Sequence, residues 1–267
     1  MTAIAVTIAG SDSGGGAGIQ ADLKSFSANG VYGASVLTAL TAQNTLGVTA
    51  IHDVPPDFIR AQMDAVYSDL KVNATKIGML SQQAVIHAVA EGLEAHDTGP
   101  VVFDPVMVAA SGDPLVADEA VAVLIDVLVP KADLITPNLH EAARMLDGTV
   151  ADGEAEMSRQ AERLKALGAK AVLLKGGHGS GAESVDLLLT DDGETWLRAP
   201  RHETRNTHGT GCTLSSAIAA GLAKGAPLVE AVRLAKIYIT DAIAAADSLQ
   251  IGAGHGPVHH FFEFWET

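Results

Sequence analysis

The segment Ile4-Ala-Val-Thr-Ile-Ala9 runs directly into Gly10-Ser-Asp-Ser-Gly-Gly-Gly-Ala-Gly18. The first six residues form an unbroken run of apolar and β-branched side chains, which predicts a strand buried on both faces. The glycines predict a tight turn, and the apolar spacing beyond them predicts a helix that ends at Gly30. A strand, a glycine-rich turn and a helix in succession are the building unit of an α/β fold.

The same alternation continues to the end of the chain. Strand-like runs at 34–42, 75–79, 101–104, 133–136 and 171–175 alternate with helix-period segments, and 185–189 and 194–197 form a hairpin around Asp-Asp-Gly. Two Ala-rich helices follow, near 210–223 and 228–246. The pattern predicts one domain over residues 1–267, a three-layer α-β-α sandwich with a mostly parallel sheet. In such sheets, ligands bind beyond the carboxyl ends of the strands.

Composition narrows the classes of function. The net charge of −15 argues against binding to nucleic acid or to an anionic membrane. A single cysteine excludes an internal disulfide and a cysteine-based zinc cluster. The N-terminus has no basic stretch or cleavage site and no apolar run spans a bilayer, so we expect a cytoplasmic protein.

The most informative stretch for chemistry is Arg205-Asn-Thr-His-Gly-Thr-Gly-Cys-Thr213. We expect a loop up to His208 and a helix opening at Gly209-Thr-Gly-Cys212. Free N–H groups at a helix start, with small residues that permit close approach, suit an anion such as a transferring phosphoryl group. An ordinary helix cap with a tight glycine turn explains the spacing equally well.

Cys212 falls in the first turn of that helix. The helix dipole there is expected to lower the pKa of the thiol and favour the thiolate. Two alternatives stay open: a small residue packed against the sheet, and a catalytic nucleophile with His208 as its base.

Three strand ends carry further polar side chains. Lys175 ends a strand before Gly176-Gly177 and is placed to neutralise a phosphate, although a solvated lysine is the commoner case. Asp104 and Glu141, with the carboxamide of Asn138, could hold Mg²⁺ through waters, although each carboxylate alone could be a cap or a surface charge.

Two other glycine or histidine patterns are less informative. Within residues 10–18, Gly14, Gly16 and Gly18 alternate, and no acidic residue ends the next strand. We therefore reject a dinucleotide-binding fingerprint and expect a backbone lid over a small substrate. His255, His259 and His260 suggest a metal only weakly, and we expect a solvated tail.

Taken together, seven ordered segments resemble the ribokinase superfamily and, within it, the hydroxymethylpyrimidine/phosphomethylpyrimidine kinases of thiamin biosynthesis. The resemblance rests on segments 9–24, Thr38-Ala-Leu-Thr-Ala-Gln-Asn44, Ile77-Gly-Met-Leu80, Asp104-Pro-Val-Met107, Ile135-Thr-Pro-Asn138, Leu174-Lys-Gly-Gly-His178 and Asn206-Thr-His-Gly-Thr-Gly-Cys-Thr-Leu214. Most of the superfamily has Asp as the catalytic base where this chain has Cys212. The pyrimidine kinase branch resembles this chain in having Cys at that position. The identity of the catalytic base therefore stays open.

The resemblance implies a ribokinase-like fold and a role for each matched position. Gln43 would bind the aminopyrimidine edge, and Asp22, Ala17, Met79 and the backbone at Val106 would complete the substrate pocket. Lys175, Asn138, Thr210 and Lys236 would lie on the ATP side, with Asp104 and Glu141 near Mg²⁺. Cys212, Lys175, Gly209 and Gly211 would form the catalytic group.

The resemblance therefore implies a homodimeric enzyme that uses Mg·ATP to phosphorylate 4-amino-5-hydroxymethyl-2-methylpyrimidine, and then its monophosphate. Pyridoxal kinase is the alternative within the superfamily, because pyridoxal also carries a ring hydroxymethyl group. Outside it, the alternatives are a Cys212–His208 hydrolase or acyltransferase and a pyrimidine-binding protein without activity.

Overall fold

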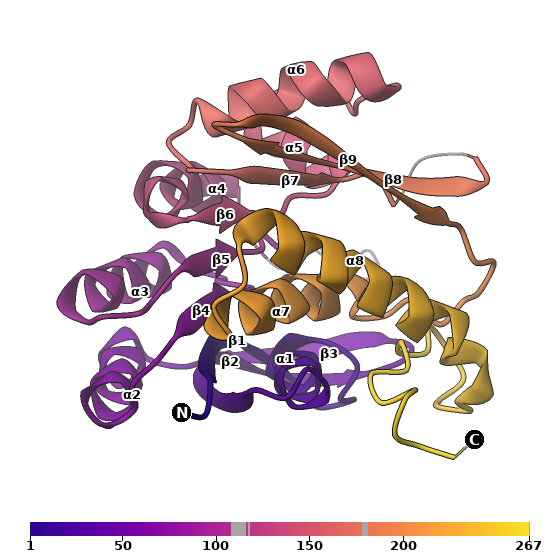
Figure 1. The fold of residues 1–267 in the computed structure, drawn as a ribbon. Helices are drawn as coiled ribbons and strands as arrows, with labels where there is room; N and C mark the ends of the chain where they lie inside the picture. The colour runs from indigo at the N-terminus through magenta and orange to yellow at the C-terminus, as the bar shows by residue number, and fades with distance from the viewer. Residues whose placement is uncertain (108–115, 117, 178–180, 267) are drawn as a thin grey trace.

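The computed structural model describes residues 1–107, 116, 118–177 and 181–266. Within this part of the chain a nine-stranded sheet has the order β3-β2-β1-β4-β5-β6-β7-β8-β9 (Figure 1). The strands are β1 Ile4–Asp12, β2 Tyr32–Asn44, β3 Gly47–Asp53, β4 Ala74–Ile77, β5 Val101–Phe103, β6 Leu134–Ile135, β7 Val172–Lys175, β8 Glu183–Thr190 and β9 Gly193–Pro200.

Six neighbouring strands of the sheet pair in parallel, in the order β2, β1, β4, β5, β6 and β7. The antiparallel strands lie at the two edges, with β3 beside β2 and with β8 and β9 beside β7. Because the parallel strands point the same way, their carboxyl ends lie along one edge of the sheet. β1 lies between β2 and β4, at the point where the strand order of the sheet reverses. Open α/β sheets form a ligand crevice at such a point.

Helices cover both faces and bury two separate apolar clusters. One face packs against α1 Gly18–Ala28, α7 Thr210–Ala223 and α8 Leu228–Ala244, which lie together in Figure 1. The other carries α2 Pro56–Asp69, α3 Gln83–Ala95, α4 Asp118–Val123, α5 Leu139–Met145 and α6 Glu154–Lys165. The predicted three-layer sandwich is confirmed. None of the helices in the described part of the chain is long and apolar enough to cross a bilayer.

One strand has no counterpart in the sequence analysis. β3 is mostly exposed and pairs only with β2, so it lacks the continuous apolar run that marks the buried strands. The predicted strand at 34–42 also extends further, to Asn44, because β3 supplies its antiparallel partner.

The expected solvated tail is wrong. His259 and His260 are buried, and His260 Nε2 lies 3.0 Å from Thr213 Oγ1 in the first turn of α7. The backbone of His208 pairs with Gly256 and Val258, so the tail backs the loop before α7. In the described part of the chain, no group of three or more His, Cys, Asp or Glu side chains could hold a metal ion.

Candidate active site

A cavity of about 770 Å³ opens at the carboxyl ends of the parallel strands. All but one of the site residues proposed from the sequence line it. Those that do are Ala17, Gln43, Met79, Asp104, Val106, Asn138, Glu141, Lys175, Gly209, Thr210, Gly211, Cys212 and Lys236. The exception is Asp22.

Lys175 and Asp104 form the charged centre of this cavity. Lys175 Nζ lies 2.7 Å from Asp104 Oδ1, and Asp104 also accepts a hydrogen bond from Thr136 at 2.9 Å. Burial alone would raise the pKa of Asp104, but Lys175 and Lys76 outweigh burial and lower it. Burial would lower the pKa of Lys175, but Asp104 and Glu141 raise it. Both groups are therefore charged at neutral pH.

Glu141 is the second carboxyl group of the site, and its surroundings disfavour its charged form. Burial, with the nearby Asp104 carboxylate, raises its pKa to about 7 even though Lys175 opposes the shift. A carboxylate held in this way is stabilised by a cation. Mg²⁺ in nucleotide sites uses one or two carboxylates and takes its remaining ligands from phosphate and water. Asp104 and Glu141 therefore fit the metal of a Mg–nucleotide complex.

The start of α7 faces the same space. Gly209 has φ +80° and packs directly on the backbone of Gly16, where a Cβ atom would clash with the Gly16 carbonyl oxygen. Thr210 N–H bonds to Thr207 O and Thr213 N–H to Gly209 O, whereas the backbone N–H groups of Gly211 and Cys212 have no acceptor among the described residues. A Cβ on Gly211 would lie 3.3 Å from Lys175 Nζ. Gly211 and Cys212 thus line the same cavity as the Lys175 ammonium, which lies close to Gly211.

The thiol of Cys212 differs from the sequence expectation. Cys212 is half-buried, and burial raises its pKa to about 11, with Lys76 opposing and Asp22 and Asp104 adding to the shift. Burial therefore raises the pKa of a thiol that its place at the helix start was expected to lower. His208 Nε2 is instead bonded to Asp12 Oδ2 at 2.8 Å, and in the described part of the chain no hydrogen bond joins His208 to Cys212. The arrangement lacks the activated dyad of a cysteine hydrolase.

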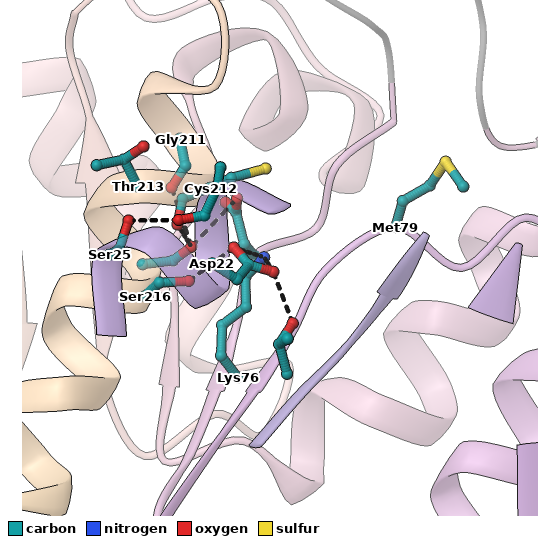
Figure 2. Close-up of polar contacts among 12 residues, drawn as sticks. Asp22, Ser25, Lys76, Met79, Gly211, Cys212, Thr213 and Ser216 are labelled. Carbon is teal, nitrogen blue, oxygen red and sulfur yellow. Dashed lines mark hydrogen bonds and ion pairs between the residues drawn. The ribbon is translucent and has the colours of Figure 1, made fainter. Parts of the chain in front are cut away.

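Asp22 does not line the cavity. Figure 2 shows its carboxylate among the side chains of Lys76 and Ser216. Its carboxylate is fully buried and lies 2.9 Å from Lys76 Nζ at both oxygens, with further hydrogen bonds from Thr7 and Ser216. The role of Asp22 in completing the substrate pocket stays a prediction, and in this structure its carboxylate is paired with Lys76 and does not line the cavity. Asp22 instead ties α1 to β4 and α7, and pairs with Lys76, a residue that lines the cavity.

Comparison with known proteins places these features in a family. The phosphomethylpyrimidine kinase family model matches residues 12–259. The chain is 62% identical over 268 residues to the hydroxymethylpyrimidine/phosphomethylpyrimidine kinase of Rhizobium meliloti, covering 100% of both chains. It is 52% identical to the protein of the same description from Salmonella typhimurium, covering 98% of both. This chain belongs to the hydroxymethylpyrimidine/phosphomethylpyrimidine kinase family.

Solved structures agree with the fold. An ADP complex of Bacillus subtilis pyridoxal kinase superposes with a TM-score of 0.90 at 36% identity, covering 97% of this chain and 98% of that one. A phosphomethylpyrimidine kinase from Clostridium difficile 630 gives 0.80 at 46% identity, covering 90% and 99%. The ribokinase-like relationship inferred from the ordered motifs is confirmed.

Two residues assigned to the nucleotide side of this kinase have structural partners. The Asn138 side chain accepts hydrogen bonds from the N–H groups of His140 and Glu141, and Glu141 Oε2 accepts from Asn138 N–H at 2.7 Å, which forms a capping box at the start of α5.

Lys236 Nζ lies 2.7 Å from Asp186 Oδ2 and 3.0 Å from Ser184 Oγ. Asp186 also accepts from Gly176 N–H, so Lys236 supports the loop after Lys175. His178, in the same motif, lies outside the described residues.

Sequence reasoning missed two site residues that the structure makes prominent. Asp12 is buried at the end of β1 and accepts hydrogen bonds from the N–H groups of Gly14, Gly16 and Ala17 as well as from His208. Lys76 is fully buried in β4. The signal for Asp12 was available, because an aspartate before a run of glycines is typical of an Asx turn. A lysine inside a short buried strand such as β4 should also have indicated a buried partner.

Proposed function

We propose that this chain transfers the terminal phosphoryl group of ATP to the hydroxymethyl group of 4-amino-5-hydroxymethyl-2-methylpyrimidine, and then phosphorylates the monophosphate to the diphosphate, in thiamin biosynthesis. The observation that carries the proposal is the convergence of Lys175 and the free N–H groups of Gly211 and Cys212 inside one cavity that also holds Gln43. Charge stabilisation of this kind is most of what phosphoryl transfer requires of a protein.

The residues on either side of that point have distinct roles in the proposal. Gln43, Ala17, Met79 and the backbone at Val106 bind the pyrimidine, and a carboxamide suits a ring nitrogen beside an amino group. Lys175 and Thr210 bind the ATP phosphates, while Asn138 and Lys236 hold the neighbouring backbone in place. Asp104 and Glu141 face Mg²⁺, which when bound with ATP supplies neutralisation of phosphate charge.

Cys212 acts in this proposal as part of the anion site. Its protonated thiol gives the substrate hydroxyl little general-base help, and its backbone N–H points at the transferring group. Since the transition state of phosphoryl transfer is loose, proton removal contributes little to the rate. As the substrate oxygen bonds to the γ-phosphorus, the bond from that phosphorus to the ADP oxygen breaks and ADP leaves. The hydroxyl proton passes to solvent, and no covalent enzyme intermediate forms.

The test is product formation by the pure protein. The protein is incubated with Mg·ATP and, separately, the aminopyrimidine, its monophosphate and pyridoxal, and the products are identified by mass. We expect a monophosphate from the first and a diphosphate from the second, with slower turnover of pyridoxal. Faster turnover of pyridoxal would move the assignment to the pyridoxal kinases, and release of phosphate without a phosphorylated product would contradict kinase activity.

We further propose that the enzyme is a cytoplasmic homodimer. Light scattering on the eluted protein is expected to give twice the chain mass of 27.4 kDa. A mass of one chain at micromolar concentration would contradict the dimer.

A further inference from the structure

Gln43 occupies an irregular position at the edge of the cavity. The pairing of β2 with β3 shifts register between Ala42 and Gln43, a β-bulge. Bulges re-aim one side chain and leave backbone groups unpaired. Here Ser13 Oγ lies 2.8 Å from both the N–H and the carbonyl oxygen of Gln43. The glycine-rich turn after β1 therefore clamps the backbone of Gln43.

A clamped backbone does not by itself fix what the side chain recognises. A carboxamide has a donor at one end and an acceptor at the other, and a half-turn exchanges them. An aminopyrimidine presents an N–H donor beside a ring-nitrogen acceptor, whereas its oxo analogue presents a carbonyl acceptor beside a ring N–H donor. A freely turning glutamine would match both rings. Selectivity between them therefore requires neighbours that hold the carboxamide in one orientation.

Thr41 is the first such neighbour. Its Oγ1 lies 2.8 Å from the carbonyl oxygen of Ser11 and 3.2 Å from Oε1 of Gln43. A threonine hydroxyl has one proton, and both of these atoms are acceptors. With that proton on the nearer Ser11 oxygen, Thr41 presents a lone pair to Gln43. The matching group on Gln43 is then the NH₂ end of the carboxamide.

His208 is the second neighbour and requires the same orientation. Its Nε2 lies 2.8 Å from Asp12 Oδ2 in a buried pair. Burial would raise the pKa of Asp12, but the hydrogen bond from His208 and the backbone N–H groups lower it, so Asp12 is a carboxylate and Nε2 of His208 carries the proton. That nitrogen lies 3.5 Å from Gln43 Nε2, which sets two donors opposite each other. A half-turn replaces one donor with the acceptor Oε1.

We propose that Thr41 and His208 are positioning residues that hold the Gln43 carboxamide with Nε2 toward Thr41 and Oε1 toward His208, and that this fixed orientation makes the pocket select the 4-aminopyrimidine over its 4-oxo analogue. The inference rests on the proposed function, because it takes Gln43 as the residue that contacts the ring. A ring with the reversed pattern would force the half-turn and forfeit both neighbouring contacts.

The test is Thr41→Val, which keeps the β-branched shape on β2 and removes only the hydroxyl. The selectivity of each protein is its kcat/KM for the aminopyrimidine divided by that for 5-hydroxymethyl-2-methylpyrimidin-4-one. We expect selectivity to fall about three- to tenfold in Thr41→Val, which is the loss that one hydrogen bond supplies. The change should appear in KM, while kcat and the KM for ATP stay close to wild type. Thr41→Ser retains the hydroxyl and should retain selectivity.

Thr49→Val is the matched control. Thr49 lies on β3 in the same hairpin, and its hydroxyl donates to Ala42 O at 2.9 Å. Among the described residues, the Gln43 side chain has its hydrogen-bonding contacts with Thr41 and His208 instead. Thr49→Val should leave selectivity unchanged. Calorimetric affinities for the two rings without ATP give the same ratio independently of turnover, and Thr41→Ala replaces Thr41→Val if the latter does not fold.

Each outcome separates the inference from the proposed function. A wild-type protein that phosphorylates the aminopyrimidine, with a Thr41→Val selectivity within twofold of wild type, overturns the positioning role and leaves the kinase assignment standing. A wild-type protein that neither binds nor phosphorylates either ring overturns the proposed function and the inference together.

Discussion

At the scale of single residues, burial outweighs local sequence context. The position of Cys212 in the first turn of a helix predicts an activated thiol, yet enclosure of the side chain raises its pKa to about 11. Lys175 shows the opposite balance. Burial lowers the pKa of its ammonium, but the carboxylates of Asp104 and Glu141 raise the pKa and keep the group charged. The sequence identifies both positions, but the sign of each pKa shift depends on neighbours far away in the chain, which local patterns do not reveal.

The raised pKa of Cys212 predicts slow alkylation. A pKa raised from 9.0 to about 11 leaves the thiol protonated at neutral pH, with about 100-fold less thiolate than an ordinary cysteine. Iodoacetamide at pH 7.5 should modify the folded protein at least about tenfold more slowly than the urea-unfolded protein. Because the chain has one cysteine, intact mass reports the modification without ambiguity.

The same residue separates direct transfer from nucleophilic catalysis. Cys212→Ser keeps the backbone N–H and should keep measurable kinase activity. A covalent adduct on Cys212 that forms and decays at the rate of turnover, or rapid alkylation of the folded protein, would contradict this account of the thiol.

Lys175 is predicted to act on the transition state. Lys175→Ala should lower kcat about 30- to 1,000-fold, because a lost charge clamp costs about 2–4 kcal/mol at the transition state. The KM for the pyrimidine should stay within about twofold, since Lys175 does not contact the ring in the proposed arrangement. Lys170→Ala is the control, because Lys170 is an exposed lysine paired with Asp133 just before the same strand. Near-normal turnover in Lys175→Ala would remove Lys175 from the mechanism.

At the scale of elements, the buried parallel strands and the helices between them follow from the sequence, while the edge strand β3 does not. Periodicity marks an element only where one face or both are buried, and β3 is mostly exposed. The buried pairing of Asp22 with Lys76 could not be predicted from local sequence either. Its place on α1, one turn after the glycine-rich segment, suits a pocket residue, but its partner Lys76 comes from β4 and lies 54 positions away. A pair at that separation appears only when the sheet brings the elements together.

The Asp22–Lys76 pair also shows how elements share a site. Neither side chain is exposed, so each needs the other to remain charged in the interior. Ser216 and Thr7 complete the hydrogen bonds of Asp22 from α7 and β1. The start of α7 is thus anchored to the central strands directly below the point where Gly211 and Cys212 offer their N–H groups. The position of the proposed anion site is set by the packing of α1, β4 and α7 together.

At the scale of the whole molecule, the C-terminal segment closes the structure around the site. Its backbone pairs with His208, and His255 N–H bonds to Thr45 O in the turn between β2 and β3. The tail therefore connects the loop before α7 with the hairpin that carries Gln43. Histidines near a chain end favoured a solvated tail, which holds for the exposed His255, and nothing in their spacing indicated that the fold would bury His259 and His260.

Burial of His260 predicts a specific sensitivity to acid. Burial, with the nearby charges of Lys24, His259 and His208, lowers its pKa to about 3 from an ordinary 6.5. The folded protein keeps this histidine neutral, and the unfolded chain protonates it below pH 6.5. Between pH 6.5 and 3 the unfolded state therefore binds one more proton at this site. The free energy of unfolding is unaffected by His260 above pH 6.5 and falls by about 1.4 kcal/mol for each pH unit below it.

The measurement is urea unfolding of wild type and His260→Gln at pH 7.5 and pH 5.0. Glutamine is neutral throughout, so the variant lacks this proton uptake, while the carboxylates contribute equally to both proteins. The substitution itself can change the free energy of unfolding at pH 7.5, so each protein is compared with itself at the two pH values. Between pH 7.5 and pH 5.0 we expect the free energy of unfolding to fall by about 2 kcal/mol more in wild type than in His260→Gln. His52→Gln, at an exposed histidine on β3, should lose as much as wild type. Equal losses in wild type and His260→Gln would mean that the tail opens and exposes His260 before the rest of the molecule unfolds.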